Sequence, residues 1–158
     1  MKRLNILLTT FLGLALVFAS CEKTPVNEWS RFYGFTKDDI AGQYNANPDE
    51  SIYEALPTQG VVVYDNATVE ITAQSGNLVS VHVIIPGVIN KVFSGTVVSD
   101  EGSSNIVFRN NNEELIVTVY KNDQNQIRLD GCVKHNYYNS HGEVIDSDYY
   151  GFDVIKED

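Results

Sequence analysis

His135 is the side chain that could most readily take part in binding chemistry. It lies in a stretch where Leu129 and Val133 occupy alternate positions, so its imidazole is predicted to share their apolar face. Tyr137 and Tyr150 are expected close to it. A polar ring among aromatic and aliphatic side chains could orient a small ligand. The alternative is a buried histidine that is hydrogen-bonded to a tyrosine or to the backbone.

The acidic residues and the other histidines do not form a recognisable metal site. Zinc needs three or four converging ligands, whereas His82 falls on the polar face of its strand and His141 falls in a turn. Asp146 and Asp148 share a strand face, but they lack the glycine-containing loop that supplies the six or more oxygens of a calcium site. We expect neither a metal nor another cofactor.

The sequence contains no arrangement typical of nucleophilic catalysis. Cys132 lies on the polar face of its strand with Lys134, whose charge could lower the pKa of the thiol. No glycine-rich phosphate loop and no Gly-x-Ser-x-Gly motif accompany it. The chain is therefore predicted not to be an enzyme. The chain has two cysteines, Cys21 and Cys132. If Cys21 is acylated, as the N-terminal residues discussed below indicate, no disulfide can form within the chain. Cys132 is then either buried, a free thiol or paired with another molecule.

These residues must be positioned by β-strands, because apolar and polar residues alternate through most of the chain after Gly60. Alternation on both sides of a short polar turn fixes which residues face each other, since a slip of one residue would expose the apolar face. Two hairpins follow: one turns at 75–77 with Ile71 opposite Val81 and Val69 opposite Val83, and one turns at 110–112 with Phe108 opposite Leu115 and Ile106 opposite Val117.

The C-terminal hairpin is predicted to turn near Glu143. In that register an apolar pair, a charge pair and aromatic pairs all lie opposite each other, and this agreement favours the register. The predicted pairs are Val133 with Val154, His135 with Phe152, Tyr137 with Tyr150, Lys134 with Asp153 and Tyr138 with Tyr149.

The number and order of the strands predict an all-β fold. About eight strands follow one another through short connections, which favours a single antiparallel up-and-down barrel over the alternative, a β-sandwich. Residues 36–158 would form this domain. Thr36 and Asp39 are expected to cap a single helical turn at its start, before a first strand at Gly42-Gln43-Tyr44.

The N-terminal residues have the layout of an export signal. Lys2-Arg3 precede an apolar stretch, Leu4–Phe18, that is shorter than the roughly 20 residues a membrane-spanning helix needs. Phe18-Ala19-Ser20-Cys21 resembles the lipobox of bacterial lipoproteins. That resemblance implies that residues 1–20 are a removed signal peptide and that Cys21 is the lipid attachment site, acylated for instance with palmitate.

A short tether, residues 21–35, would join Cys21 to the barrel and ends in a cluster of aromatic residues. These rings could form a plug that closes one end of the barrel, or a stacking platform for a carbohydrate or a partner. The cluster consists of Trp29, Phe32, Tyr33 and Phe35.

The charge of the chain restricts its partners. The 158 residues include 11 basic and 21 acidic side chains, a formal net charge of −10. Without Lys2 and Arg3, nine basic side chains stand against the same 21 acidic ones, a net charge of −12. This balance excludes nucleic acid, whose phosphates need clustered cations, and disfavours electrostatic adhesion to anionic lipid.

Two features resemble known proteins. Gly42-Gln43-Tyr44 follows a short helical turn, as the Gly-x-Trp motif does in calycin and lipocalin-like barrels, with Tyr44 in the tryptophan position. Residues 21–158 as a whole resemble small uncharacterised lipoproteins of Bacteroidales with a calycin-like barrel. The resemblance implies a fold and a location in the bacterial cell envelope, with the outer membrane as the expected anchor, but no reaction.

Two functions remain in view. The first is a lipid-anchored binding protein that carries a small apolar or amphipathic ligand, or a partner, in the barrel. The second is a structural or interaction lipoprotein, such as an accessory subunit or an inhibitor, with a packed interior. An apolar cavity above roughly 300 Å³ would favour the first function. Its predicted lining is Tyr44, Val69, Val81, Leu129, His135, Tyr137, Tyr150 and Phe152.

Overall fold

The computed structural model describes residues 28–47, 62–97 and 102–157. Within them the chain is all-β, with 64% of residues in strands and 4% in helix. The predicted signal segment 1–20 and the predicted lipid attachment site Cys21 lie outside the described residues. The elements, in chain order, are β1 (Ser30–Arg31), α2 (Lys37–Ile40), β2 (Gly42–Ala46), β3 (Val62–Tyr64), β4 (Thr68–Ala73), β5 (Leu78–Ile85), β6 (Ile89–Thr96), β7 (Asn105–Asn110), β8 (Glu113–Lys121), β9 (Ile127–Tyr138) and β10 (Val144–Lys156).

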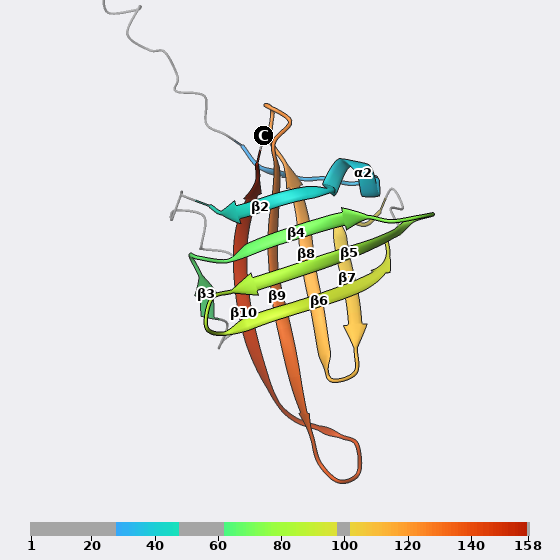
Figure 1. Ribbon diagram of the computed structural model, residues 1–158, viewed down its shortest axis with the longest axis vertical. Helices are drawn as coiled ribbons and strands as arrows, with labels where there is room; N and C mark the ends of the chain where they lie inside the picture. The colour runs from blue at the N-terminus through green and yellow to red at the C-terminus, as the bar shows by residue number, and fades with distance from the viewer. Residues whose placement is uncertain (1–27, 48–61, 98–101, 158) are drawn as a thin grey trace, which may run out of the picture.

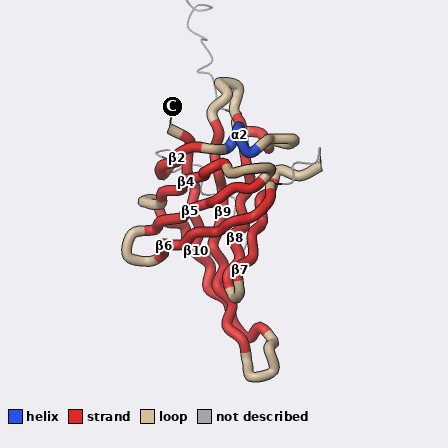
Figure 2. Tube along the Cα trace, turned by 45° about the vertical axis from the view of Figure 1, so that its right-hand side comes forward, coloured by secondary structure: helices blue, strands red, loops and turns tan. Residues whose placement is uncertain are grey.

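The strands form one curled sheet of ten strands in the order β1-β8-β9-β10-β2-β4-β5-β6, with β7 beside β8 and β3 beside β10. In Figure 1, β2, β4, β5 and β6 run across β8, β9 and β10 at a steep angle, and Figure 2 shows both sets from another side. The sheet is not closed. The pairing of β3 with β10 is parallel, whereas the sequence predicts antiparallel neighbours throughout.

The helical turn α2 forms as predicted. The Thr36 hydroxyl accepts a hydrogen bond from the backbone N–H of Asp39, and the Asp39 carboxylate accepts one from the backbone N–H of Thr36 at 2.7 Å. The Thr36 hydroxyl also donates to the Asp39 carboxylate at 2.6 Å, and this bond, followed by the one from the Thr36 backbone N–H, lowers the pKa of Asp39. The turn buries Ile40, whose carbonyl accepts a hydrogen bond from the Tyr44 hydroxyl at 2.6 Å. The turn therefore ties the start of β2 to the core.

Two hairpins have the predicted registers. Ile71 pairs with Val81 and Val69 with Val83 between β4 and β5. Phe108 pairs with Leu115 and Ile106 with Val117 between β7 and β8, around a turn where Asn111 has a φ of 52°. In both hairpins the alternation of apolar residues was sufficient to predict the register, because a short turn leaves no competing register.

The predicted register of the C-terminal hairpin is wrong. Val133 pairs with Tyr150 and His135 with Asp148, and a bulge between Val144 and Asp146 shifts the end of β10. The cause is the position of the turn, which lies before Glu143. The side chain of Asn139 accepts hydrogen bonds from the backbone N–H groups of His141 and Glu143, a local turn that alternation alone does not reveal. All five predicted pairs are therefore replaced.

The interior of the curled sheet is packed. Tyr44, Val69, Val81, Leu129 and Phe152 are each at most 2% exposed and belong to one core cluster. At two glycines the absence of a side chain allows an aromatic ring to pack directly on the backbone of a strand. A Cβ atom on Gly131 would lie 2.6 Å from the ring of Phe152, and one on Gly95 would lie 2.3 Å from the ring of Phe108.

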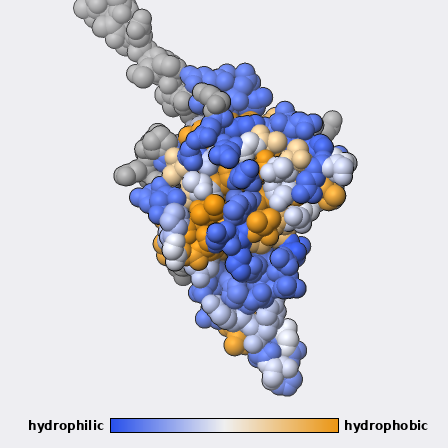
Figure 3. All heavy atoms as spheres, in the orientation of Figure 1, coloured by the Kyte–Doolittle hydropathy of each residue, from blue (hydrophilic) through white to orange (hydrophobic). Residues whose placement is uncertain are grey.

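The surface is mainly polar but carries apolar patches. Figure 3 shows hydrophobic atoms in the middle of the front face, bordered by hydrophilic residues. Val92 on β6 is one exposed apolar side chain of the sheet. The β9–β10 hairpin, which extends beyond the other strands in Figures 1 and 2, adds four more. They are Tyr137, Tyr138, Val144 and Ile145, which are 43%, 45%, 51% and 65% exposed.

Candidate functional site

A cavity of about 240 Å³ lies at one end of the curled sheet, near the base of the projecting β9–β10 hairpin. The start of β6, the start of β8 and the middle of β9 and β10 border it, and it is open to solvent. Its lining combines aliphatic, polar and aromatic side chains, of which Val88 and Tyr137 are exposed. It is lined by Val88, Ile89, Lys91, Glu113, Val133, His135, Tyr137 and Tyr150.

Strand pairing explains why the polar residues gather there. Glu113 on β8 and Asp148 on β10 both lie directly opposite His135 on β9. One row deeper, Tyr150 and Leu115 lie on either side of Val133. Side chains at opposite positions project to the same face of a sheet. The inner face therefore changes from aliphatic to polar as it approaches the open end.

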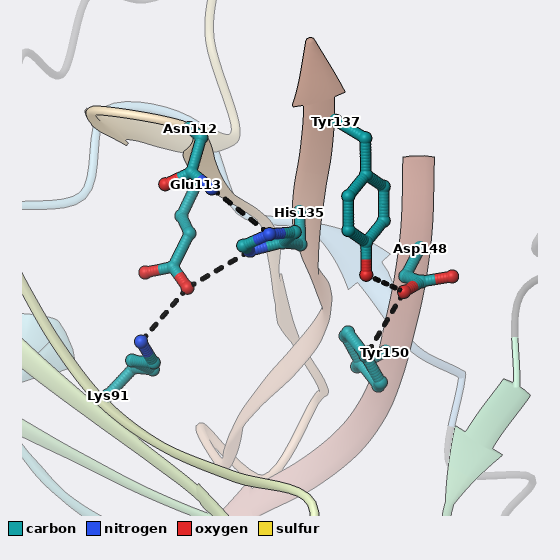
Figure 4. A network of polar contacts seen from close by, with 7 residues as sticks. All are labelled: Lys91, Asn112, Glu113, His135, Tyr137, Asp148 and Tyr150. Carbon is teal, nitrogen blue, oxygen red and sulfur yellow. Dashed lines mark hydrogen bonds and ion pairs between the residues drawn. The ribbon is translucent and has the colours of Figure 1, made fainter. Parts of the chain in front are cut away.

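A chain of four polar residues forms one wall of the cavity (Figure 4). Lys91 Nζ lies 3.0 Å from Glu113 Oε1, and His135 Nδ1 lies 3.3 Å from the same oxygen. Asn112 Nδ2 lies 3.0 Å from His135 Nε2. When the Asn112 amide donates to Nε2, the imidazole is neutral and its Nδ1–H donates to Glu113. The ring is thus held in one orientation from both sides.

Two tyrosines and an aspartate form the second polar group. In Figure 4 the hydroxyls of Tyr137 and Tyr150 converge on Asp148. They donate to its Oδ2 at 2.6 Å and 3.4 Å. The hydrogen bond to Asp148 is the main cause that raises the pKa of Tyr137 to about 12, while burial followed by the Asp148 charge raises that of Tyr150. Both phenols therefore stay protonated at neutral pH. The rings of His135 and Tyr137 meet edge to face at 4.9 Å.

The two groups differ in charge. Lys91 and Glu113 neutralise each other. Asp146 and Asp148 have no ion-pair partner within 4.0 Å among the described residues, so the hairpin side of the cavity carries uncompensated negative charge. This arrangement can bind and orient a small molecule through aromatic faces and hydrogen bonds.

The structure brings together three of the eight predicted lining residues. His135, Tyr137 and Tyr150 line the cavity, with His135 on the inner face as expected but at the open end, where it is half-buried. The other five are packed in the core: Tyr44, Val69, Val81, Leu129 and Phe152. Two of them, Tyr44 and Val69, also border a second pocket of about 160 Å³.

The sequence analysis did not find Lys91, Glu113 and Asn112, and it considered Asp148 only as a calcium ligand. Glu113 and Asn112 could have been found from the predicted β7–β8 hairpin, because that hairpin places them at the turn beside β9. Lys91 carries no such signal. It comes from β6, which does not pair with β8, so only the curl of the sheet brings the two together.

Lys134 lowers the pKa of Cys132, as expected, but other effects outweigh it. Burial is the largest of the effects that raise the pKa of this thiol to about 11, and the charges of Asp130 and Glu114 add to it. Lys134 only partly offsets them. Cys132 also lies on the face of β9 opposite to His135. Among the described residues, no group of three or more His, Cys, Asp or Glu side chains could hold a metal ion.

The aromatic segment packs mainly inward. Phe35 is buried, and Phe32 packs against the core with its ring 6.0 Å from that of Phe35. Trp29 lies over Arg128, with 5.9 Å between the guanidinium carbon and the ring centre. Tyr33 is exposed. Three of the four rings therefore contact the body of the protein, an arrangement that suits a plug better than a platform.

The fold and the site define an all-β protein with a small polar and aromatic cavity at one end of a curled sheet. No family model, no curated protein and no solved structure matches the chain. The similarity to calycin barrels and to Bacteroidales lipoproteins therefore stays a prediction. No helix in the described part of the chain is both long and apolar enough to span a bilayer.

Proposed function

We propose that this chain is a non-enzymatic binding protein, anchored by lipid in the bacterial cell envelope, that holds a small ligand or part of a partner in the end cavity. The cavity carries the proposal, because it combines aliphatic side chains with oriented polar groups and aromatic rings. Its volume, about 240 Å³, is below the roughly 300 Å³ that would favour a carrier with an apolar lumen. The ligand that we propose is therefore smaller than such a lumen would hold, and it is partly exposed.

The anchor rests on the sequence. A basic start, an apolar stretch and Cys21 after two small residues support export and acylation, with the outer membrane as the favoured location. Labelling cells with a palmitate analogue tests it. The wild-type chain should become labelled and stay with the membrane fraction, whereas Cys21→Ser should not be labelled. Equal labelling of both chains would rule out acylation at this cysteine.

A calycin-like barrel is the architecture we propose for this sheet. Two contacts between the edge strand β6 and the β7–β8 hairpin support it. Phe108 on β7 packs on Gly95 of β6, and Lys91 on β6 pairs with Glu113 on β8. A sandwich would instead keep its two sheets as separate layers. Hydrogen-exchange protection of the β6 amides that face β7 would favour the barrel, and rapid exchange there would favour the sandwich.

The binding function can be tested by filling the cavity. Val88→Trp places a large ring at the lining, and Val92→Trp places the same ring on β6 outside it. Full-length protein extracted from native membranes would be analysed for copurifying small molecules by mass spectrometry. We expect a ligand on the wild type and on the Val92 variant, and none on the Val88 variant. The same compounds on all three, or none on any, would contradict the proposal.

A second candidate, an interaction lipoprotein with a packed interior, is favoured by the exposed hairpin tip. A photo-crosslinking residue at Ile145 would be compared with one at Val107, which is also exposed but lies on β7. A discrete adduct at Ile145 alone, unaffected by Val88→Trp, would favour this function. Equal or absent adducts would count against it.

A further inference from the structure

The end cavity has an uneven distribution of charge that indicates the charge of its ligand. On the β6 side, Lys91 is neutralised by Glu113 at 3.0 Å. On the β10 side, Asp148 accepts the hydroxyls of Tyr137 and Tyr150 and has no cationic partner among the described residues. The exposed side chain of Asp146 adds a second negative charge, which contributes to the raised pKa of Tyr137.

The aromatic rings on this side favour the same sign of charge. Tyr137 and Tyr150 line the cavity directly, while Asp148 binds their hydroxyls and is not part of the lining. The face of a phenol ring is electrically negative and attracts a cation that lies within about 6 Å of its centre. Donation of both hydroxyls to a carboxylate makes the rings richer in electrons. Asp148 is therefore a positioning residue for two cation-binding rings.

Neither anions nor uncharged molecules gain as much from this arrangement. An anion would meet the carboxylates of Asp146 and Asp148 and, at longer range, the formal net charge of −10. Its cationic partner would be Lys91, which already binds Glu113. The amide of Asn112 lies 3.0 Å from His135 Nε2 and carries no charge. A cationic group, by contrast, replaces bulk water with aromatic faces and uncompensated carboxylates.

We infer that the end cavity binds a small organic cation, a protonated or quaternary amine, with its charged group at the Tyr137–Tyr150 side and its apolar part on Val88, Ile89 and Val133. This inference rests on the proposed binding function and names the class of its ligand. The cavity of about 240 Å³ suits a single ring or a short chain that carries one ammonium group.

Three probes of nearly the same size and shape separate charge from fit: tyramine, which is cationic at neutral pH, tyrosol, which is neutral, and 4-hydroxyphenylacetate, which is anionic. Binding to the full chain in detergent would be measured by calorimetry. We expect tyramine to bind roughly tenfold more tightly than tyrosol, as one partly desolvated cation–π contact allows, and the anion to bind most weakly. Added salt should reduce the preference for tyramine.

Two substitutions test the direction of the effect. Asp148→Asn should reduce the ratio of tyramine to tyrosol affinity to roughly one to three. Lys91→Gln should raise that ratio by about two- to fivefold, because it removes a repelling charge and frees Glu113. Asp123→Asn, in the turn at the far end of β8, and Lys134→Gln, on the opposite face of β9, make the same chemical changes away from the cavity. They should leave the ratio unchanged.

The ratio distinguishes the possible results. A structural disturbance would weaken both probes together, so a loss confined to tyramine supports the inference. Equal affinities, or tightest binding of 4-hydroxyphenylacetate, would overturn the inference and leave the proposed binding function standing. No binding of any probe at concentrations of about 10 mM, where even weak complexes form, would overturn both.

Discussion

Asp148 accepts two phenol hydroxyls, and this has a consequence at high pH. The pKa of Tyr137 is about 12, above the ordinary value near 10, so the folded state holds this proton more tightly than the unfolded chain. The stabilisation is fully present below pH 10 and is lost as the pH rises through about 12. Burial raises the pKa of Tyr44 as well, so it adds to alkaline unfolding.

We therefore expect Tyr137 to ionise at a higher pH than an ordinary tyrosine in an absorbance titration. The difference between wild type and Tyr137→Phe isolates this one phenol and should show a midpoint near pH 12. When both chains also carry Asp148→Asn, the midpoint of this difference should move toward pH 10, because the carboxylate that disfavours the phenolate is gone. Asp123→Asn is the matched control. A midpoint at the ordinary value in the wild-type protein would show that the hydrogen bond to Asp148 does not form in solution.

Cys132 should be a slow thiol. Its pKa of about 11 leaves little thiolate at neutral pH, and the thiolate is the reactive form. We expect a maleimide to modify it far more slowly in the folded chain than in denaturant, with a rate that rises steeply up to about pH 11. Comparison with Cys132→Ser identifies the modified site. Fast modification of the folded chain at neutral pH would contradict this burial.

At the scale of elements, β6 and β7 meet without pairing, and a glycine permits the contact. A Cβ atom on Gly95 would lie 2.3 Å from the buried ring of Phe108. Gly95→Ala should therefore cost about 1–3 kcal/mol in the free energy of unfolding, the usual range for overpacking. Urea unfolding would measure it, with Ser94→Ala as the control on the same strand. Equal stability of the two variants would mean that β6 and β7 separate in solution.

The hairpins show what the sequence could predict. The registers of β4–β5 and β7–β8 could be predicted from the alternation of apolar and polar residues, because each turn is short and its polar residues mark where it lies. The β9–β10 hairpin failed because Asn139 moves the turn toward the N-terminus. The inward face was still predicted correctly, since the shift is an even number of residues. His135 and Tyr150 were therefore correctly predicted to line the same face, although their predicted pairing partners were wrong.

The candidate site was harder to predict than the strands. Four of its lining residues, Val133, His135, Tyr137 and Tyr150, come from two paired strands, β9 and β10, whose alternation reveals the shared face. Lys91 comes from a strand that is distant in the order of the sheet. Curvature depends on twist, bulges and glycines in combination, and these determine where a lumen fills and where a cavity is left. The alternation of apolar and polar residues along a strand does not predict how the whole sheet curves.

At the scale of the whole molecule, Arg128 and Asp153 join three distant segments. Arg128 Nε donates to Asp153 Oδ1 at 2.8 Å, and both side chains are buried. Asn47, just after β2, donates its backbone N–H to the carbonyl of Asp153 at 3.0 Å. Trp29 and Tyr120 lie over the guanidinium. The pair therefore connects the N-terminal segment, the end of β2 and the C-terminal hairpin.

Removing one member of this pair should destabilise the whole fold. Arg128→Met leaves a buried carboxylate without its cation, which typically costs about 3–5 kcal/mol. The double variant Arg128→Met/Asp153→Leu should recover most of that loss, because the buried carboxylate of Asp153 is removed together with its cation. Denaturant unfolding of the single and double variants measures both effects. A double variant no more stable than the single one would show that the pair contributes more than mutual neutralisation.

The length of β8 has a topographic consequence. β1 pairs with its C-terminal end at Lys121, while Glu113 at its N-terminal end reaches the cavity. Eight residues of extended chain separate these points, about 26 Å at a rise of roughly 3.3 Å per residue. If the chain is held to a bilayer through Cys21, this length of β8 would separate the cavity from the N-terminal end of the described chain.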